Sequence, residues 1–487
     1  MSDRPLEPTS PSLAAKRQLL ADLLQKQAKN AKVPSPLTVP LSFAQQRLWF
    51  LDQLEPGSAA YNIAFEINLT GTLQVAALTQ ALNQVVHRQE ALRTAFHPVA
   101  GQSVQVILPT LQLALPLVDL QGLPVAQQTV EVTRLAAADA RCPFDLTRAP
   151  LLRVTLVRLA AQQHVLLLTM HHMIADGWSM KVLFQELATH YGAFSKGQPS
   201  PLPPLPIQYA DFAVWQQQQL QGERLDQQLT YWRSQLQGSL PVLKLPIASP
   251  RSAASNSQGA IHQFSLSEKL TQALKTFSQR QNVTLFMTLL TAFKILLYRY
   301  SGQPDILIGT PIANRNRTEL EGIIGFFANT LVLRTDLSGN PTVVELLGRI
   351  RETALGAYAH QDMPFERLVD ELKLPRHLSH HPLFQVLFVL QNTPNSVVKL
   401  PELTLDVQEN ESAAAKFDLS LAFSDSSLGL LGRIEYRTQQ FDPASIGRLA
   451  AHLQILLTEI VTQPQQPITA LPLLPPSERQ TLLSTWN

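Results

Sequence analysis

Cysteine is almost absent from this sequence of 487 residues, in which Cys142 is the single thiol. One cysteine can form neither an internal disulfide nor a cysteine-based metal cluster. This composition favours a reducing compartment, so we expect the protein to be cytoplasmic. The first 36 residues contain several prolines and no apolar core of the signal-peptide type, and nothing in them predicts export.

Charged residues are also scarce. They make up 16% of the chain, against about 25% in an ordinary soluble protein, and the net charge is +2. Such a chain has no electrostatic reason to bind nucleic acid or a membrane of anionic lipid. Hydrophobic residues make up 45% of it, which excludes a disordered chain, and the weak charge suggests a surface partly covered by neighbouring protein.

Long hydrophobic runs and nucleotide-binding loops are missing as well. The most apolar longer segment, residues 283–298, is interrupted by threonines and a lysine, so it predicts a core-facing helix and no membrane span. The sequence contains no GxSxG elbow, no GxxxxGK[ST] loop and no GxGxxG turn. Without a nucleotide site, any energy for bond formation must arrive in an already activated substrate. Without an obvious nucleophile, direct transfer assisted by a histidine is simpler than a reaction through a covalent acyl-enzyme.

Proline-containing segments divide the chain, whose length predicts roughly three domains or two large ones. Residues 1–36 predict an N-terminal linker with a short amphipathic helix at 14–30, and residues 471–487 predict a linker toward a downstream domain. Residues 199–206, PSPLPPLP, predict a stiff extended connector. Linkers at both ends are typical of a domain within a longer assembly.

Helical and strand-like patterns alternate on both sides of this connector. The main segments predicted are helices at 78–94, 209–235 and 267–300, and strands at 103–108, 151–159, 306–309 and 331–336. This order predicts an α/β fold with two lobes of similar size, residues 37–206 and residues 207–470.

The segment most suggestive of a reactive site is VLLLTMHHMIADGWS, residues 165–179. Its apolar start predicts a buried strand, and a helix capped by Asp176 or Ser179 is expected to follow. Adjacent strand residues point to opposite faces, so only one of His171 and His172 can face a given cleft. Histidine titrates near neutral pH, which suits proton transfer with an amine or hydroxyl.

Two other interpretations of this segment stay open on spacing alone. A histidine pair at a strand end can serve packing or hydrogen bonding, and the Asp-Gly pair that follows can be a simple turn. A metal site formed by His171, His172 and Asp176 is disfavoured, because neighbouring strand residues diverge and no further ligand is evident.

The same segment resembles the HHxxxDG signature of condensation domains from nonribosomal peptide synthetases, within the chloramphenicol-acetyltransferase-like superfamily. Further segments are similar to other motifs of that family, with Gln89 standing where glutamate or histidine is also seen. These segments are SFAQQRLWFL (42–51), HRQEALRTAF (87–96), YADFAVW (209–215), IGTPIANR (308–315), IGFFANT (324–330), HQDMPFE (360–366) and, in part, PLFQ (382–385).

The resemblance implies two acetyltransferase-like lobes arranged as a V-shaped pseudodimer with a central tunnel. Donor and acceptor peptidyl carrier proteins would each bring a 4'-phosphopantetheine arm into this tunnel, with no permanently bound cofactor and no metal. The acceptor amine would attack the donor thioester and form an amide. An adjacent adenylation domain is the further partner that the C-terminal segment implies.

The resemblance also implies roles for individual residues. His172 matches the family's catalytic position, as a base or by orienting the amine and stabilising the tetrahedral intermediate, and His171 is expected to pack behind the strand. The backbone N–H of Gly177 would face the tunnel. Asp176 is expected to be structural, with Arg315 as its partner. The residues expected to line the tunnel or contact substrate are Trp178, Ser179, Asn329 and Arg47.

The sequence also resembles one subtype of the family and leaves two alternative functions open. Trp178 and Ser179 directly after Asp-Gly resemble the variety that joins an L-configured donor to an L-acceptor. Two alternatives are a relative that acylates a free amine or alcohol, and a catalytically silent platform of the same fold that recruits other proteins. The presence of both histidines and of Asp-Gly argues against the silent platform.

Overall fold

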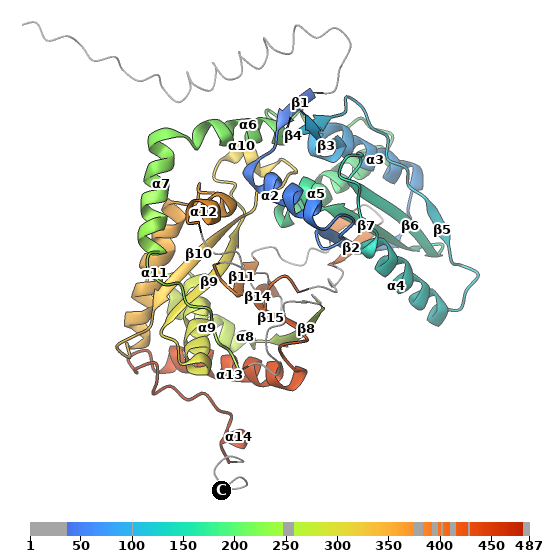
Figure 1. Cartoon of the computed structure of the whole chain (residues 1–487). Coiled ribbons are helices and arrows are strands. Elements are labelled where there is room, and N and C mark those ends of the chain that lie inside the picture. Colours follow the sequence, from blue (N-terminus) through green and yellow to red (C-terminus); the bar gives the residue numbers. More distant parts are fainter. Residues whose placement is uncertain are drawn as a thin grey trace, which may run out of the picture.

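The computed structural model describes residues 37–99, 101–246, 258–373, 383–391, 398–400, 403–409, 415–426 and 429–480. The amphipathic helix predicted at 14–30 and the end of the predicted C-terminal linker, 481–487, lie outside these residues. The described chain forms two α/β lobes that meet at one end and diverge toward the other, as a V (Figure 1). The predicted fold class is therefore confirmed.

The first lobe contains a small sheet and a large one. In the part of the chain that the structure describes, the small sheet has the strand order β1-β4-β3 and the large sheet the order β12-β13-β2-β7-β6-β5. The elements from the first half of the chain are β1 (Leu37–Pro40), α2 (Phe43–Leu54), β2 (Asn62–Gly71), α3 (Val75–Arg88), η1 (Glu90–Arg93), β3 (Thr94–Val99), β4 (Gln102–Ile107), β5 (Leu117–Asp119), α4 (Val125–Arg141), β6 (Leu152–Ala160), β7 (Gln163–His171), η2 (His172–Ile174) and α5 (Gly177–Phe194).

The second lobe is built around a sheet with the order β10-β9-β11-β14-β15-β8 among the described strands. The elements from the second half of the chain are α6 (Tyr209–Gln219), α7 (Gly222–Gln235), β8 (Gly259–Ser265), α8 (Glu268–Arg280), α9 (Leu285–Ser301), β9 (Asp305–Ile312), α10 (Thr318–Glu321), β10 (Asn329–Asp336), α11 (Val343–Ala359), α12 (Phe365–Glu371), β11 (Val386–Gln391), β12 (Val398–Leu400), β13 (Leu403–Glu409), β14 (Leu419–Ser426), β15 (Gly429–Arg437), α13 (Pro443–Thr462) and α14 (Pro476–Gln480).

Two strands from the second half of the chain lie in the first lobe. Strand β13 pairs antiparallel with β2 from Leu403 opposite Gly71 to Glu409 opposite Phe65, and β12 continues the sheet outward. The predicted boundary between residues 206 and 207 therefore does not separate the two lobes completely. Main-chain pairing with β2 completes a sheet edge of the first lobe, and short-range sequence patterns do not encode such a distant pairing.

Strand β7 explains the apolar run that precedes the histidines. Its residues alternate between two buried faces, with Leu166, Leu168 and Met170 in the core beside α3 and α5. Val165 and Leu167 lie in a separate cluster with Val132 of α4. Because helices cover both faces, every residue from His164 to His171 is buried, and period-two alternation is absent from the sequence.

Helix α9 is the buried centre of the second lobe, as the apolar pattern of residues 283–298 predicted. Among the described helices, α13 is long and apolar enough to pass as a membrane span by composition. However, residues such as Leu449, Leu453 and Leu456 of α13 are buried in the same core as α9. The helical stretches predicted at 209–235 and 267–300 are present, each as two helices, with breaks at residues 220–221 and 281–284.

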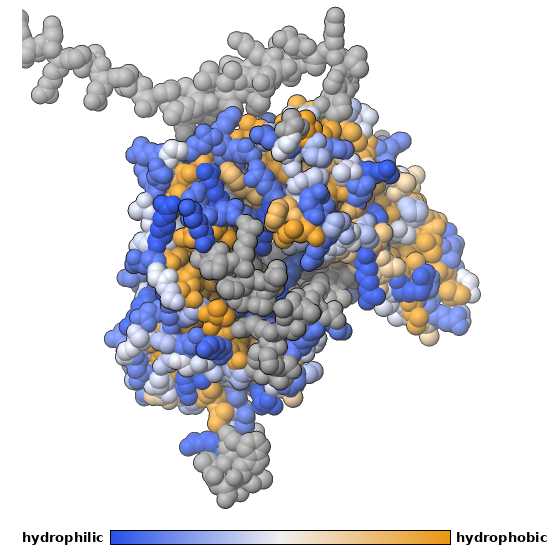
Figure 2. All heavy atoms as spheres, in the orientation of Figure 1, coloured by the Kyte–Doolittle hydropathy of each residue, from blue (hydrophilic) through white to orange (hydrophobic). Residues whose placement is uncertain are grey.

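Some apolar side chains remain exposed on the first lobe. Val125 and Val130 of α4 are 77% and 69% exposed, and Leu117 of β5 is also exposed. Figure 2 shows apolar residues on the right-hand side of the view, where Figure 1 places α4 and β5. The suggestion from the weak charge, that neighbouring protein covers part of the surface, stays a prediction.

Candidate active site

The end of strand β7 separates the two adjacent histidines. Thr169 and His171 share the strand face that looks toward α4, and the Thr169 hydroxyl donates a hydrogen bond to the carboxylate of Asp139 on that helix. The strand ends at His171, and the 3₁₀ turn η2 begins with His172. The change from strand to turn directs the two imidazoles into different surroundings, as the alternation of strand side chains predicted.

His171 lies behind the strand in an aromatic environment. Its ring packs edge-on against Tyr61 and Phe144, with ring centroids 6.4 Å and 6.2 Å away. Its Nδ1 accepts a hydrogen bond of 3.1 Å from the N–H of Met173. Burial, helped by the charge of Lys416, lowers the pKa of His171 to about 4. The side chain is therefore neutral at pH 7 and holds the turn in place.

His172 is oriented by its own turn. Its Nδ1 lies 3.1 Å from the carbonyl oxygen of Ala175. A carbonyl only accepts hydrogen bonds, so Nδ1 carries the proton and Nε2 carries the lone pair. Nε2 has no hydrogen-bond partner among the described residues. The residue is only partly buried, and Nε2 is not among the fully buried polar atoms of the described structure that lack a partner, so this lone pair remains accessible to a substrate group.

The surroundings of His172 keep its imidazole neutral. Burial lowers its pKa well below the ordinary value of 6.5, and the charge of Lys416 and the neighbouring His171 act in the same direction. A neutral imidazole can accept a hydrogen bond or a proton from an amine. However, a lowered pKa makes it a weaker base than free imidazole, which favours orienting the amine over complete proton removal.

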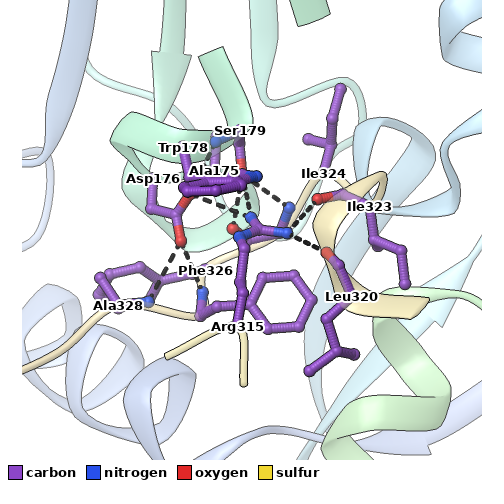
Figure 3. Close-up of polar contacts among 12 residues, drawn as sticks. Ala175, Asp176, Trp178, Ser179, Arg315, Leu320, Ile323, Ile324, Phe326 and Ala328 are labelled. Carbon is purple, nitrogen blue, oxygen red and sulfur yellow. Dashed lines mark hydrogen bonds and ion pairs between the residues drawn. The ribbon is translucent and has the colours of Figure 1, made fainter. Parts of the chain in front are cut away.

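Asp176 caps helix α5 and anchors it to the other lobe. One carboxylate oxygen, Oδ1, accepts from the N–H of Ser179 at 2.8 Å and from the Arg315 guanidinium at 3.2 Å. The Asp176 and Arg315 side chains are 3% and 1% exposed. The predicted pairing of Asp176 with Arg315 is present (Figure 3). The same guanidinium donates to the carbonyl oxygens of Leu320 and Ile323.

Further side chains of the first lobe hold the main chain of residues 321–328. Ser179 Oγ donates to the Gly325 carbonyl and accepts from the Gly325 N–H, at 2.8 Å and 3.1 Å. Asp176 Oδ2 accepts from the N–H groups of Phe327 and Ala328 (Figure 3). The segment 321–328 therefore lies against the start of α5, where Ser179 binds the peptide groups of Gly325 and Asp176 binds those of Phe327 and Ala328.

Gly177 and Trp178 lie at the surface of this contact. Gly177 is exposed, and a Cβ atom at its position would meet open space. Its backbone therefore borders free volume. The Trp178 indole N–H donates to the carbonyl oxygen of Glu321 at 2.9 Å, so this side chain connects the two lobes.

Ser179 and Asn329, which were expected to line the tunnel, take part in contacts between segments. Ser179 is fully buried, and Asn329 is 8% exposed. The Asn329 amide donates to the carbonyls of Gln361 and Met363, and its oxygen accepts from the N–H of Phe365. The polar groups of Ser179 and Asn329 are thus bound within the protein, and neither side chain lies on an open surface.

Arg47 remains partly accessible. Its guanidinium lies 3.1 Å from the carboxylate of Glu366 on α12, and the two side chains are 35% and 21% exposed. It thereby connects α2 of the first lobe with the second lobe, while part of its surface stays open to other groups.

Sequence reasoning did not single out two residues that complete the site. Gln89, noted only as a departure from a motif, donates to Glu186 and to the Gly322 carbonyl and accepts from the Ile324 N–H. Only an amide both donates twice and accepts in this way, which accounts for glutamine at this position. Phe326 lies beside His172, and its membership of the segment IGFFANT was the signal that could have indicated it.

No group of three or more His, Cys, Asp and Glu residues in the described part of the chain is arranged to hold a metal ion. His171, His172 and Asp176 are bound to different partners, namely the Met173 N–H, the Ala175 carbonyl and the Arg315 cluster. These three side chains do not converge on one point.

Two α/β lobes with a histidine turn at their junction define a protein of the acetyltransferase-like fold. The sequence model of the condensation-domain family matches residues 37–483, so the chain belongs to this family. It is 49% identical over 484 residues to one of the linear gramicidin synthase proteins of Brevibacillus parabrevis. That match covers 98% of this chain and 6% of the synthase, so the chain corresponds to a small part of that relative.

Solved structures show the same architecture. A structure of the complex of the X-domain and OxyB from teicoplanin biosynthesis matches 91% of this chain and 98% of the matched chain, with 30% identity and a TM-score of 0.80. The first condensation domain of the calcium-dependent antibiotic synthetase matches 91% of this chain and all of its own length, with a TM-score of 0.76. At 20% identity this second likeness shows the fold. The chain is a condensation domain of the kind found in nonribosomal peptide synthetases.

Proposed function

We propose that this domain forms amide bonds between two carrier-bound substrates. The nitrogen of an acceptor aminoacyl thioester attacks the carbonyl carbon of a donor acyl or peptidyl thioester. The C–N bond forms, the donor C–S bond breaks, and the donor pantetheine leaves as a thiol after it receives the proton that the amine loses. Both arms belong to partner carrier proteins, and they would meet in a tunnel between the lobes.

The observation that carries this proposal is the state of His172. Its Nε2 lone pair is accessible and unpaired among the described residues, because Nδ1 donates to Ala175. An α-amino group has a pKa near 8, so an appreciable fraction is already free base at neutral pH. A neutral imidazole that orients this amine and accepts its proton is sufficient for the reaction.

The open space at Gly177 supports the same geometry. The exposed glycine lies five residues after His172 and starts α5, so a pantetheine arm can approach the imidazole along its backbone. Substrates, product and the neighbouring adenylation domain belong to the larger assembly, and we propose them by analogy with the relatives. Trp178 and Ser179 after Asp-Gly favour an L-configured donor and an L-acceptor.

The experiment is to replace His172 by alanine and to measure the product formed from one loaded donor carrier and one loaded acceptor carrier by mass spectrometry. We expect amide formation to fall by about 10²- to 10⁴-fold, the usual contribution of a positioned proton acceptor. His87→Ala is the matched control, because His87 is an exposed histidine on α3. Unchanged turnover in His172→Ala, with both variants folded, would reject the catalytic assignment.

The same assay separates the alternatives. Product from a free amino acid or alcohol, and none from a carrier-bound acceptor, would indicate an acyltransferase that uses one carrier. Absence of any product from the unaltered chain would favour a recruitment platform, an interpretation supported by the likeness to the X-domain, whose structure was solved in complex with OxyB.

A further inference from the structure

We propose that Phe326 is a positioning and specificity-determining residue for the reaction at His172. This inference rests on the proposed function, because it concerns how an acceptor amine reaches the imidazole. Phe326 comes from the second lobe, whereas His172 belongs to the first. Their ring centroids are 5.5 Å apart and the ring planes are inclined by 59°.

The main chain around Phe326 is fixed by groups of the first half of the chain and of α6. The Phe326 carbonyl accepts a hydrogen bond of 2.7 Å from the Tyr209 hydroxyl. On one side Gly325 is bound by Ser179, and on the other Phe327 is bound by Asp176. Because the residue and both of its neighbours are held, the Cα atom of Phe326 has little freedom to move relative to α5.

Gly325 shows how close this packing is. A Cβ atom at Gly325 would collide with the Tyr209 ring. Tyr209 is itself 1% exposed, and its hydroxyl also lies 2.8 Å from Ser42 Oγ, near the start of α2. A glycine is required here so that the loop can approach α6 closely, and this approach determines where the next side chain projects.

The Phe326 ring lies between two hydrophobic clusters. It packs against the first-lobe core, which includes Met173 and Ile174, and against the cluster of Tyr209, Phe212 and Phe327. The residue is nevertheless only partly buried. The ring is therefore anchored by packing against both clusters, while part of the residue stays accessible to solvent.

Two contacts then define the orientation of the His172 ring. The hydrogen bond from Nδ1 to Ala175 limits rotation in the plane of the ring, and contact with Phe326 limits its tilt. With both present, Nε2 is held in one direction. In this proposal an acceptor amine approaches Nε2 beside the Phe326 ring, and the ring restricts the size of the substituents next to that amine.

The test uses Phe326→Ala and Phe326→Leu in the complete chain, with acceptor carriers loaded with glycine or with phenylalanine and one fixed donor. We expect Phe326→Ala to slow transfer to the glycyl acceptor, because the imidazole is less well oriented. We also expect the rate ratio of phenylalanyl to glycyl acceptor to rise by roughly tenfold, a change typical of altered space in an apolar pocket. Phe326→Leu should show both changes more weakly.

The matched control is Phe212→Leu. Phe212 belongs to the cluster that Phe326 packs against, and it makes no ring contact with His172 in the described structure. It should lower the melting temperature without changing the acceptor ratio. An unchanged acceptor ratio in both Phe326 variants, or an equal change in Phe212→Leu, would overturn the specificity role.

A measurement independent of turnover tests the positioning role. Nitrogen-15 chemical shifts of the His172 imidazole, assigned by comparison with His172→Gln, report which ring nitrogen carries the proton. We expect one tautomer, protonated at Nδ1, in the unaltered protein and a mixture in Phe326→Ala, because a ring that is free to tilt loses its alignment with the Ala175 carbonyl. An unchanged single tautomer would overturn the positioning role. An unaltered chain that forms no amide would instead reject the proposed function, and the specificity role with it.

Discussion

Asp176 of the first lobe and Arg315 of the second form an ion pair of 3.2 Å at a place where both side chains are almost fully buried. The carboxylate also binds three main-chain N–H groups, two of them in the second lobe. Burial lowers the pKa of Arg315 from its ordinary value, and the nearby carboxylate opposes this shift. A single carboxylate, that of Asp176, therefore caps helix α5, pairs with Arg315 and holds the two lobes together.

We expect Asp176→Asn to lower the free energy of unfolding by roughly 3 to 5 kcal/mol, because it leaves the buried Arg315 charge without a counter-charge. Asp176→Ala should lower the melting temperature as well, since it also removes the cap of α5. Urea denaturation measures the free energy of unfolding, and thermal denaturation measures the melting temperature. The control is Asp362→Asn, whose partner Arg224 is 42% exposed, and there we expect a loss below about 1 kcal/mol. Equal losses for Asp176→Asn and Asp362→Asn would contradict the structural role of the buried pair.

Arg47 and Glu366 offer a way to separate lobe contact from substrate contact. Their ion pair is partly exposed, so each of Arg47→Gln and Glu366→Gln should cost no more than about 1 kcal/mol of stability. We expect Arg47→Gln to slow amide formation more than Glu366→Gln, because Arg47 is the member we propose to contact substrate. Single-turnover rates of both variants provide the comparison. The substrate role of Arg47 fails if the two rates are equally reduced.

The lowered pKa of His171 predicts that the fold loses stability in acid. Its pKa of about 4 in the folded protein is below the value of about 6.5 expected in the unfolded chain. The unfolded chain therefore binds more protons between these values, and stability decreases as the pH falls from 6.5 toward 4, by up to roughly 3 kcal/mol. His171→Gln cannot titrate, so its unfolding free energy should change less over this range. Parallel curves for the two proteins would show that His171 does not control this acid range.

The lowered pKa of Lys294 predicts that the stability of the fold depends on pH in the neutral to alkaline range. It is fully buried in the second lobe, and its Nζ donates to the carbonyls of Ile306 and Leu333 and to the Thr335 hydroxyl. Burial lowers its pKa to about 7, against about 10.4 in an unfolded chain. The unfolded chain binds more protons between these values. Stability should therefore rise with pH from 7 to 10, by up to about 1.4 kcal/mol per pH unit from this group.

Lys294→Met is the corresponding variant, because methionine fills a similar volume without a charge. The difference in unfolding free energy between the unaltered protein and this variant, measured at pH 7 and at pH 9.5, isolates the lysine. A difference that does not change between the two pH values would contradict the lowered pKa.

Several parts of the site could be predicted from local patterns. The run from Val165 to Met170 predicted a buried strand, and strand β7 is present. The spacing after Gly177 predicted a helix capped by Asp176 or Ser179, and the structure shows Asp176 as the cap, accepting from the Ser179 N–H. These features depend on contacts within a few residues, so short-range periodicity and capping preferences are sufficient to indicate them.

Other parts could not be predicted, because they depend on residues far apart in the chain. The pairing of β13 with β2 places residues 403–409 in the first lobe, although the sequence boundary assigned them to the second. Ser179 and Asn329 were expected to face substrate, and the structure shows their polar groups bound to main-chain atoms of the second lobe. No local pattern indicates which distant peptide group a buried side chain will bind.

The sequence by itself determined the α/β fold class, the position of the two histidines at a strand end and the family to which the chain belongs. Only the tertiary structure decided that the Nδ1 proton of His172 is bound to Ala175, that Nε2 is left free among the described residues, and that Phe326 from the other lobe lies against the ring. The physical reason is that periodicity and capping act over a few residues. In contrast, the protonation and accessibility of an imidazole depend on every group that the fold brings around it.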